Sequence, residues 1–158
     1  MATYSRAELG NFSSIVCFKA VIVGMEDMLG EQATAISLKA AGRKRGADLA
    51  QSLGFSKGSA SVNDLPQIAR TLDEALGPNG TRLCRIDKIE PEGDKIRVYA
   101  SETICSAGEE MGSPRTCTFT LGAVHGAIEY LLDKQYAGKH VESVLRGGTH
   151  DVFEFTPR

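Results

Sequence analysis

The chain has 158 residues, of which 42% are hydrophobic and 24% are charged, and its formal net charge is -2 at pH 7. These values are ordinary for a globular protein, and a chain of this length fits one domain, here residues 1–158, that buries roughly two-thirds of its unfolded surface. Because the net charge creates no broad positive field, we expect neither nucleic acid nor an anionic membrane as a partner.

The first predicted element is an amphipathic helix over residues 11–29, capped by Asn11 or Ser13. Its apolar stripe consists of Phe12, Ile15, Phe18, Ile22, Met25 and Leu29. A second helix follows over residues 31–53 and carries Gly42 and Gly46 in its interior. Interior glycines cost about 1 kcal/mol each relative to alanine, so we expect close approach of another helix or of a ligand to offset them.

A glycine- and serine-rich connector, residues 54–61, separates these helices from a third, shorter one. The third helix is predicted to run from a cap at Asn63 or Asp64 to Leu76, with Pro66 in its first turn.

After the third helix, the spacing of apolar residues changes from the helical period to strict alternation with polar residues, which is typical of strands. Residues 83–89 and 96–102 alternate apolar and polar side chains and are joined by a turn over 90–94, so they predict an antiparallel hairpin. A polar loop over residues 106–115 leads to a long helix at about 118–135.

A final hairpin within residues 140–155 turns at Gly147-Gly148. The order is therefore α-α-α-β-β-α-β-β, which predicts an α+β fold with a four-stranded antiparallel sheet packed against helices.

The C-terminal forty residues resemble the corresponding half of the 4-vinyl reductase domain. That domain is a small-molecule and hydrocarbon-binding module related to the heme–nitric-oxide-binding domain and to the TRAPP vesicle-tethering subunits. The matching positions are Cys117, Phe119, Thr120, Gly122, Gly126, Ala127, Val141, Glu142 and Phe155, and in the second helix Gly30, Ala33, Ala41, Gly42 and Gly46. Two late cysteines of the family pattern are replaced here by Leu145 and Phe153, a departure that points away from metal chemistry.

The cysteines and histidines do not form a metal signature. The spacings of Cys84, Cys105, Cys117 and His125 match no zinc pattern, so we expect a structural role or, for a thiol such as Cys117, ligand contact, and no metal requirement. Four cysteines without a Cys-x-x-Cys pair also favour reduced thiols over a disulfide framework. His140 and His150 flank strands and are predicted at the surface; His125 lies in an apolar stretch and fits a core or pocket wall.

No pattern for catalysis is found. Residues 122–126 lack the serine of a nucleophile elbow, and Cys117 and His125 lie two helical turns apart, beyond hydrogen-bond reach. No flavin, nicotinamide or iron–sulfur motif is present either, so we expect no catalytic residue and leave the cofactor unknown.

Gly122 and Gly126 stand four residues apart in the last helix and clear a groove along it. Two interpretations are open: tight packing against another element, or a channel for a flat or long apolar ligand between this helix and the first one. In the second interpretation the candidate ligand-binding residues are Phe18, Ile22, Met25, Cys117, Phe119, Gly122, His125, Gly126 and Tyr130.

The resemblance implies a non-catalytic protein that binds a hydrophobic small molecule, tetrapyrrole-like or lipid-like, with a role in pigment metabolism or photosynthesis. The alternatives are an accessory subunit or assembly factor of a pigment reductase or photosynthetic complex, and a dimerising adaptor like the TRAPP subunits.

Two further expectations concern assembly and location. Val16, Ala20, Val21 and Val23 extend the apolar surface of the first helix beyond its main stripe, which predicts a homodimer. The longest apolar run, residues 20–25, is far shorter than the ~20 residues of a membrane span, and no signal peptide is found, so a cytoplasmic protein is expected.

Overall fold

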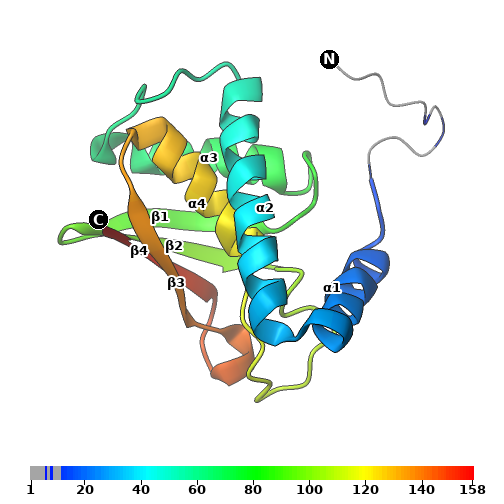
Figure 1. Ribbon diagram of the computed structural model, residues 1–158. Helices are drawn as coiled ribbons and strands as arrows, with labels where there is room; N and C mark the ends of the chain where they lie inside the picture. The colour runs from blue at the N-terminus through cyan, green and yellow to red at the C-terminus, as the bar shows by residue number, and fades with distance from the viewer. Residues whose placement is uncertain (1–5, 7, 9–11) are drawn as a thin grey trace.

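The structure, a computed structural model, describes residues 6, 8 and 12–158 (Figure 1). In this part of the chain four α-helices and four strands follow in the predicted order, so the α+β prediction is confirmed. The helices are α1 (Ile15–Leu29), α2 (Glu31–Ser52), α3 (Leu65–Leu76) and α4 (Phe119–Leu132), and the strands are β1 (Arg85–Glu92), β2 (Lys95–Ser101), β3 (Tyr136–Glu142) and β4 (Asp151–Pro157). Short 3₁₀ turns occupy Val62–Asp64 and Val144–Arg146.

The sheet is antiparallel throughout, with strand order β1-β2-β4-β3. The first hairpin is longer than predicted, because pairing continues to Glu92 and Lys95 and leaves only two residues in the turn. Pro91 is accommodated within β1 because that strand lies at the edge of the sheet. A register shift between Ile86 and Lys88 changes the alternation, so that Ile89 is buried.

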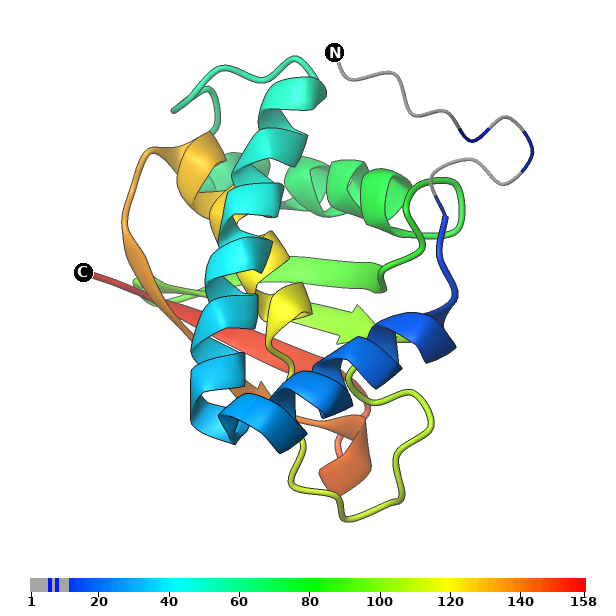
Figure 2. The same cartoon turned by 45° about the vertical axis from the view of Figure 1, so that its right-hand side comes forward.

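The helices form two levels over one face of the sheet (Figures 1 and 2). α4 lies on the sheet, α2 crosses over α4, α3 packs beside them against β1, and α1 lies to one side, next to the start of α2. The core forms between α4 and the sheet, and its largest members include Leu121, Val124, Ile128, Ile96, Val98, Tyr136, Phe153 and Phe155. α4 is thus the central helix, buried over nearly its whole length.

The helix boundaries differ from the predictions where local capping decides them. α1 begins after Ser14, whose side chain accepts a hydrogen bond from the Val16 N–H, rather than after Ser13; the alternative cap Asn11 lies outside the described residues. α4 ends at Leu132, before the predicted limit, because Asp133 adopts a left-handed conformation with φ 48°. Asp64 precedes α3 as predicted, but its side chain bonds to Ser61 instead of capping the helix.

The interior glycines of α2 and α4 lie where the two helices cross, each against the backbone of the opposite helix. A Cβ atom on Gly42 would overlap the carbonyl oxygen of Phe119, and one on Gly126 would overlap that of Arg43. The structure therefore supports the tight-packing interpretation, and the space beside Gly122 and Gly126 is filled by α2 instead of forming a channel toward α1.

No helix in the described part of the chain combines the length and the apolarity needed to cross a bilayer.

Candidate functional site

Two of the predicted wall residues, Phe18 of α1 and Phe119 at the start of α4, are in contact, and two more lie beside Phe18 on α1. Ile22 is the only residue of α1 that is fully buried, and Phe18 and Met25 are half-buried around it. The Phe18 ring meets the Phe119 ring edge-on, with 5.4 Å between the ring centroids. We call the three apolar side chains of α1 that are buried or half-buried, together with Phe119, the α1–α4 cluster: Phe18, Ile22, Met25 and Phe119.

The other predicted residues of α4 lie farther along the helix. His125 is buried, and its Nε2 lies 3.0 Å from the carbonyl oxygen of Tyr136 and 3.1 Å from Oε1 of Glu129. Burial lowers the pKa of His125, so the imidazole is neutral and satisfied within the protein. The Tyr130 hydroxyl donates to the carbonyl oxygen of Phe55 at 3.3 Å. Since a helix rises about 1.5 Å per residue, Tyr130 is about 16 Å along α4 from Phe119 and belongs to a different surface.

That surface is an open depression of about 510 Å³ between α2 and the end of α4, lined in part by Arg43, Gly126, Glu129 and Tyr130. Its lining includes several charged side chains, among them Arg43 and Glu129, which form an ion pair at its wall. Burial raises the pKa of Glu129, but the hydrogen bonds from the Tyr136 N–H and from Arg43 outweigh that effect, and the net pKa is lowered. The depression therefore holds a fixed carboxylate and suits an apolar ligand poorly.

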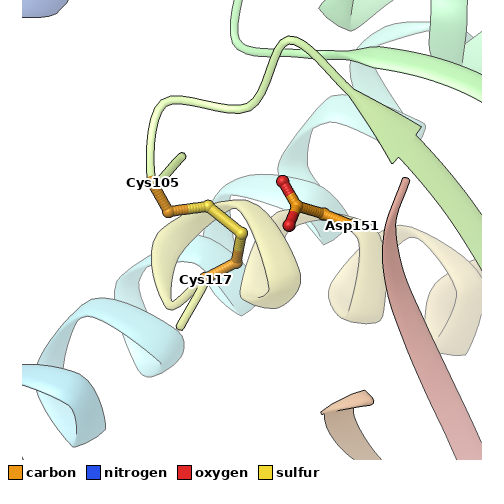
Figure 3. A group of neighbouring side chains, drawn as sticks. All are labelled: Cys105, Cys117 and Asp151. Atoms are coloured by element: carbon orange, nitrogen blue, oxygen red, sulfur yellow. A yellow bond between two sulfur atoms is a disulfide. The ribbon is translucent and has the colours of Figure 1, made fainter. Parts of the chain in front are cut away.

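A buried cluster that the sequence analysis did not identify lies at the start of α4 (Figure 3). Cys105, in the loop after β2, forms a disulfide with Cys117, which lies two residues before the first residue of α4; their Cα atoms are 5.2 Å apart. The expectation of reduced thiols is wrong for this pair, while Cys17 and Cys84 are free. The pairing depends on how the loop folds back over 12 residues, which no local sequence pattern encodes.

The carboxylate of Asp151 lies beside this disulfide (Figure 3), and hydrogen bonds hold it from several sides. It accepts hydrogen bonds from the Thr103 hydroxyl, from the Ser106 hydroxyl at 2.7 Å and from His140 Nε2 at 3.2 Å. Burial raises the pKa of Asp151, but these hydrogen bonds, His140 first among them, outweigh burial and hold the pKa well below its usual range.

The histidine of this cluster corrects another prediction. His140 was expected at the surface, but its side chain is 3% exposed, and its Nδ1 accepts the Cys117 N–H at 3.0 Å. One signal in the sequence pointed to the cluster: Asp151 is in phase with the inward-facing Phe153 and Phe155 of β4, so a carboxylate occupies a core position.

The loop closed by the disulfide also fastens α1 to the rest of the molecule. Lys19 donates to the Ala107 carbonyl oxygen at 2.8 Å and pairs with Glu109 at 2.7 Å. Arg115 pairs with Glu26 at 2.9 Å and with Glu109 at 2.6 Å. We call these four charged side chains, Lys19, Glu26, Glu109 and Arg115, the polar clasp. They hold α1 at the surface while the α1–α4 cluster packs beneath it.

Comparisons of the fold identify solved structures of the same architecture, although no family model and no curated protein matches the sequence. The phenol-responsive sensory domain of the transcription activator PoxR, solved with phenol, superposes with a TM-score of 0.70 at 13% identity, over 92% of this chain and 75% of that one. A vinyl-4-reductase family protein from Methanocaldococcus jannaschii gives a TM-score of 0.51 at 16% identity, over 96% and 85% of the two chains. A trafficking protein particle complex subunit 3 from Naegleria fowleri, covalently bound to palmitic acid, gives 0.49 at 11% identity, over 92% and 97%.

The chain therefore has the fold of the vinyl-4-reductase family protein and of the PoxR sensory domain, as the resemblance of its C-terminal half implied.

Proposed function

We propose that this chain is a binding domain for an apolar small molecule, and that the ligand binds between α1 and the start of α4. The observation that carries the proposal is the α1–α4 cluster: Ile22 is buried, and Phe18 packs on Phe119. Apolar walls with few polar groups suit an apolar ligand. Support comes from the fold shared with a sensory domain that responds to phenol.

The way α1 is attached suggests how a ligand enters. Most of its length is exposed, and it is held by one fully buried side chain, Ile22, and by the polar clasp. Gly30, with φ 85°, joins α1 to α2 and gives the chain a pivot that a residue with a Cβ would restrict. In the proposed mechanism α1 tilts about Gly30, the Phe18 ring leaves Phe119, and the ligand takes its place.

The class of ligand is the finer part of the proposal. We retain a tetrapyrrole-like or lipid-like compound, and a role in pigment metabolism, from the resemblance of the sequence. We also retain one domain over residues 1–158, no catalytic residue, and a cytoplasmic location. Of the candidate binding residues, Phe18, Ile22, Met25 and Phe119 form the proposed site, Cys117 adjoins it in sequence, and Gly122, His125, Gly126 and Tyr130 support α4.

The proposal is tested by calorimetric titration of the protein with phenol, palmitate and protoporphyrin IX, which represent compact aromatic, long-chain and tetrapyrrole ligands. Ile22→Trp should fill the space under α1 and weaken binding of the accepted probe at least about tenfold, or 1.4 kcal/mol. Met28→Trp places the same side chain on the exposed side of α1 and should leave affinity within about twofold.

Binding that responds equally to both substitutions would contradict this location. A protein that takes up none of the three probes at a Kd below about 1 mM would contradict the binding function itself and favour the accessory-subunit alternative, which acts by protein contact.

A second function, self-association, is favoured by the outer side of α1. Val16 is 72% and Met28 83% exposed, Val21 and Val23 are exposed beside them, and Asp27 is the one charged residue of that side. A Cβ on Gly24 would meet no atom within 4 Å, so another helix can approach closely there. An exposed apolar face of this kind usually marks an interface, and a two-fold axis makes such a face complementary to itself. We propose a homodimer through this face.

Light scattering at about 100 µM, well above the dissociation constant of a specific dimer, should give twice the chain mass. Val16→Glu combined with Val23→Glu should return the protein to a monomer, because the charges would be buried at the interface. Val62→Glu with Met111→Glu makes equivalent changes at exposed apolar residues outside α1 and should leave the dimer intact. A parent protein of single-chain mass would rule out this assembly.

A further inference from the structure

One loop makes every polar contact that the side chains of α1 form with the rest of the described chain. That loop is the segment between Cys105 and Cys117, which follows β2 and runs alongside α1 (Figure 2). Lys19 donates to the carbonyl oxygens of Cys105 and Ala107, at 3.2 and 2.8 Å, and the remaining contacts are the ion pairs of the polar clasp. The attachment of α1 therefore depends on what holds this loop in place.

Apart from the disulfide, few contacts hold the loop to the body of the protein. It contains no helix or strand, and no residue between its two cysteines is buried. The Ser106 hydroxyl donates to Asp151, the Gly112 N–H donates to the Leu145 carbonyl oxygen at 2.7 Å, and Arg146 donates to two carbonyl oxygens of the loop. A cross-link between residues 12 apart removes conformational freedom that the open loop would have. Cleavage of the disulfide therefore loosens the loop, and the polar clasp with it.

The surroundings of the disulfide accommodate the reduced form as well. The hydroxyl oxygen of Thr103 lies 3.2 Å from Sγ of Cys105 and 3.8 Å from Sγ of Cys117. Because that hydroxyl donates its proton to Asp151, its oxygen is free to accept a hydrogen bond from a thiol. Cys105 is 7% exposed and Cys117 is 0% exposed, so a reductant meets the sulfur of Cys105 first.

We propose that the Cys105–Cys117 disulfide is a redox switch for the attachment of α1: the oxidised loop holds the polar clasp closed, and reduction lets α1 detach from the body. The reductant is a dithiol. One of its thiolates attacks Sγ of Cys105 and forms a mixed disulfide, while the sulfur of Cys117 leaves and takes up a proton. The second sulfur of the reductant then displaces Cys105, which is protonated in turn. The protein gains two electrons and two protons, and the dithiol that supplies them becomes a disulfide.

Regulation of ligand uptake follows from the switch, and this step rests on the proposed function. The ligand enters when α1 tilts and Phe18 leaves Phe119, and an intact clasp opposes that movement. A ligand that binds only the open state gains apparent affinity in proportion to the population of that state, so reduction should strengthen binding. In a reducing compartment, such as the cytoplasm proposed above, a disulfide is usually transient or redox-sensing, which suits a switch better than a permanent cross-link.

Hydrogen exchange followed by mass spectrometry tests the switch without any ligand. The Cys17→Ser protein serves as the parent, because Cys17 is the exposed free thiol. Its oxidised form is compared with the form reduced by dithiothreitol at the same protein concentration, and alkylation of the thiols confirms the redox state. The amides of α1 should exchange at least about tenfold faster in the reduced protein, and those of residues 124–132 in α4 should be unchanged.

Cysteine variants separate the disulfide from other effects of the reductant. Cys105→Ser combined with Cys117→Ser should exchange like the reduced parent, with or without dithiothreitol. Cys84→Ser removes a buried free thiol instead, and it should respond to reduction as the parent does.

A variant of the polar clasp tests the route by which the disulfide acts on α1. Lys19→Met combined with Glu26→Gln removes both charged side chains that α1 contributes to the clasp. The amides of α1 should then exchange fast in the oxidised protein, and reduction should change their rate by less than about twofold, because the two changes act on the same contact.

Equal exchange of α1 in the oxidised and the reduced parent would overturn the proposal, as would a full redox effect in the clasp variant. Fast exchange throughout the reduced protein, α4 included, would also overturn it, because the disulfide would then support the whole fold.

Titration of both redox forms with phenol, palmitate and protoporphyrin IX keeps the switch distinct from the ligand site. If neither form binds any probe, the ligand site is wrong, and the exchange of α1 alone decides the switch. Equal affinity of the two forms for an accepted probe would overturn the regulation of the site.

Discussion

Thr34 and Thr120 each bury a hydroxyl group that has no hydrogen-bond partner within the described part of the chain. A buried hydroxyl that loses its hydrogen bonds to water and gains none in return costs about 1–3 kcal/mol. Both threonines lie in the first turn of a helix, α2 and α4 respectively, and α4 is the helix that bears the proposed ligand site. They are the two residues of the described part of the chain with a buried side-chain polar atom that forms no hydrogen bond.

We therefore predict that Thr120→Val stabilises the protein by about 1 kcal/mol, since valine keeps the shape and removes the unsatisfied hydroxyl. Urea unfolding measures the change. Thr103→Val is the matched control: its buried hydroxyl donates to Asp151, so the same substitution there should destabilise by about 1–3 kcal/mol. A loss of stability in Thr120→Val would show that the hydroxyl has a partner, such as an internal water molecule.

Asp73 illustrates a polar residue whose role is structural. It accepts two hydrogen bonds from Arg85, at 2.8 and 3.0 Å, and one from the Ile86 N–H at 2.9 Å, so it ties α3 to the first residues of β1. The Arg85 guanidinium beside it holds the pKa of Asp73 below its usual value, and the Ile86 N–H acts in the same direction.

Because the pKa of Asp73 is lower in the folded than in the unfolded chain, its contribution to stability is fully present above the unfolded value near 4 and is lost as the pH falls below it. We predict that Asp73→Asn costs about 1.5–3 kcal/mol at pH 7 and less at pH 3, measured by urea unfolding at both pH values. Asp48→Asn, which breaks an exposed pair with Lys44, should cost about 0.5 kcal/mol or less. An Asp73→Asn cost that is independent of pH would contradict this account.

At the scale of elements, the crossing of α2 over α4 is the contact most sensitive to substitution, because it requires glycine at several positions. Gly42 meets Gly122, while Gly46 and Gly126 each meet the backbone of other residues on the opposite helix. A Cβ at any of these four glycines would collide with that backbone. The periodic placement of small residues predicted a close contact, but spacing along one helix carries no information about which neighbour fills it. For that reason the sequence alone could not show that α2, and not a ligand, occupies the space beside Gly122 and Gly126.

Gly126→Ala should destabilise the protein by about 1–3 kcal/mol, because the new Cβ overlaps the Arg43 carbonyl and the helices must separate. Gly24→Ala is the matched control, because Gly24 also lies inside a helix but no atom occupies its Cβ position. There the higher helix propensity of alanine should stabilise the protein by about 0.5–1 kcal/mol. Thermal unfolding of both variants decides the matter. A neutral Gly126→Ala would mean that the helices are farther apart than the structure shows.

At the scale of the whole molecule, the order of elements could be predicted because changes of hydrophobic period are local properties of the sequence. What could not be predicted are the contacts between distant segments. The Cys105–Cys117 disulfide and the burial of His140 beside Asp151 arise only when the loop after β2 folds against the start of α4 and of β4. The α1–α4 cluster was partly predictable, because its residues lie on helical stripes, but its separation from Tyr130 follows from the length of α4.

The fold also predicts a gradient of local stability from α4 to α1. Eleven residues of α4 are buried, whereas α1 buries Ile22 alone and is otherwise held by the polar clasp. Local opening free energies range from near zero for weakly packed segments up to the global value for the core, so the amides of α1 should exchange with deuterium far faster than those of α4.

Hydrogen exchange followed by mass spectrometry then connects stability with assembly. If the outer side of α1 pairs with a second copy, exchange in α1 should slow as protein concentration rises, because association stabilises the paired state by mass action. The Val16→Glu and Val23→Glu double variant should show fast α1 exchange at every concentration, and the Val62→Glu and Met111→Glu control should behave like the parent. Exchange in α4 should be similar in all three proteins, since its burial is complete within one chain. Concentration-independent exchange in α1 of the parent would mean that this helix stays unpaired and that its apolar side serves another purpose.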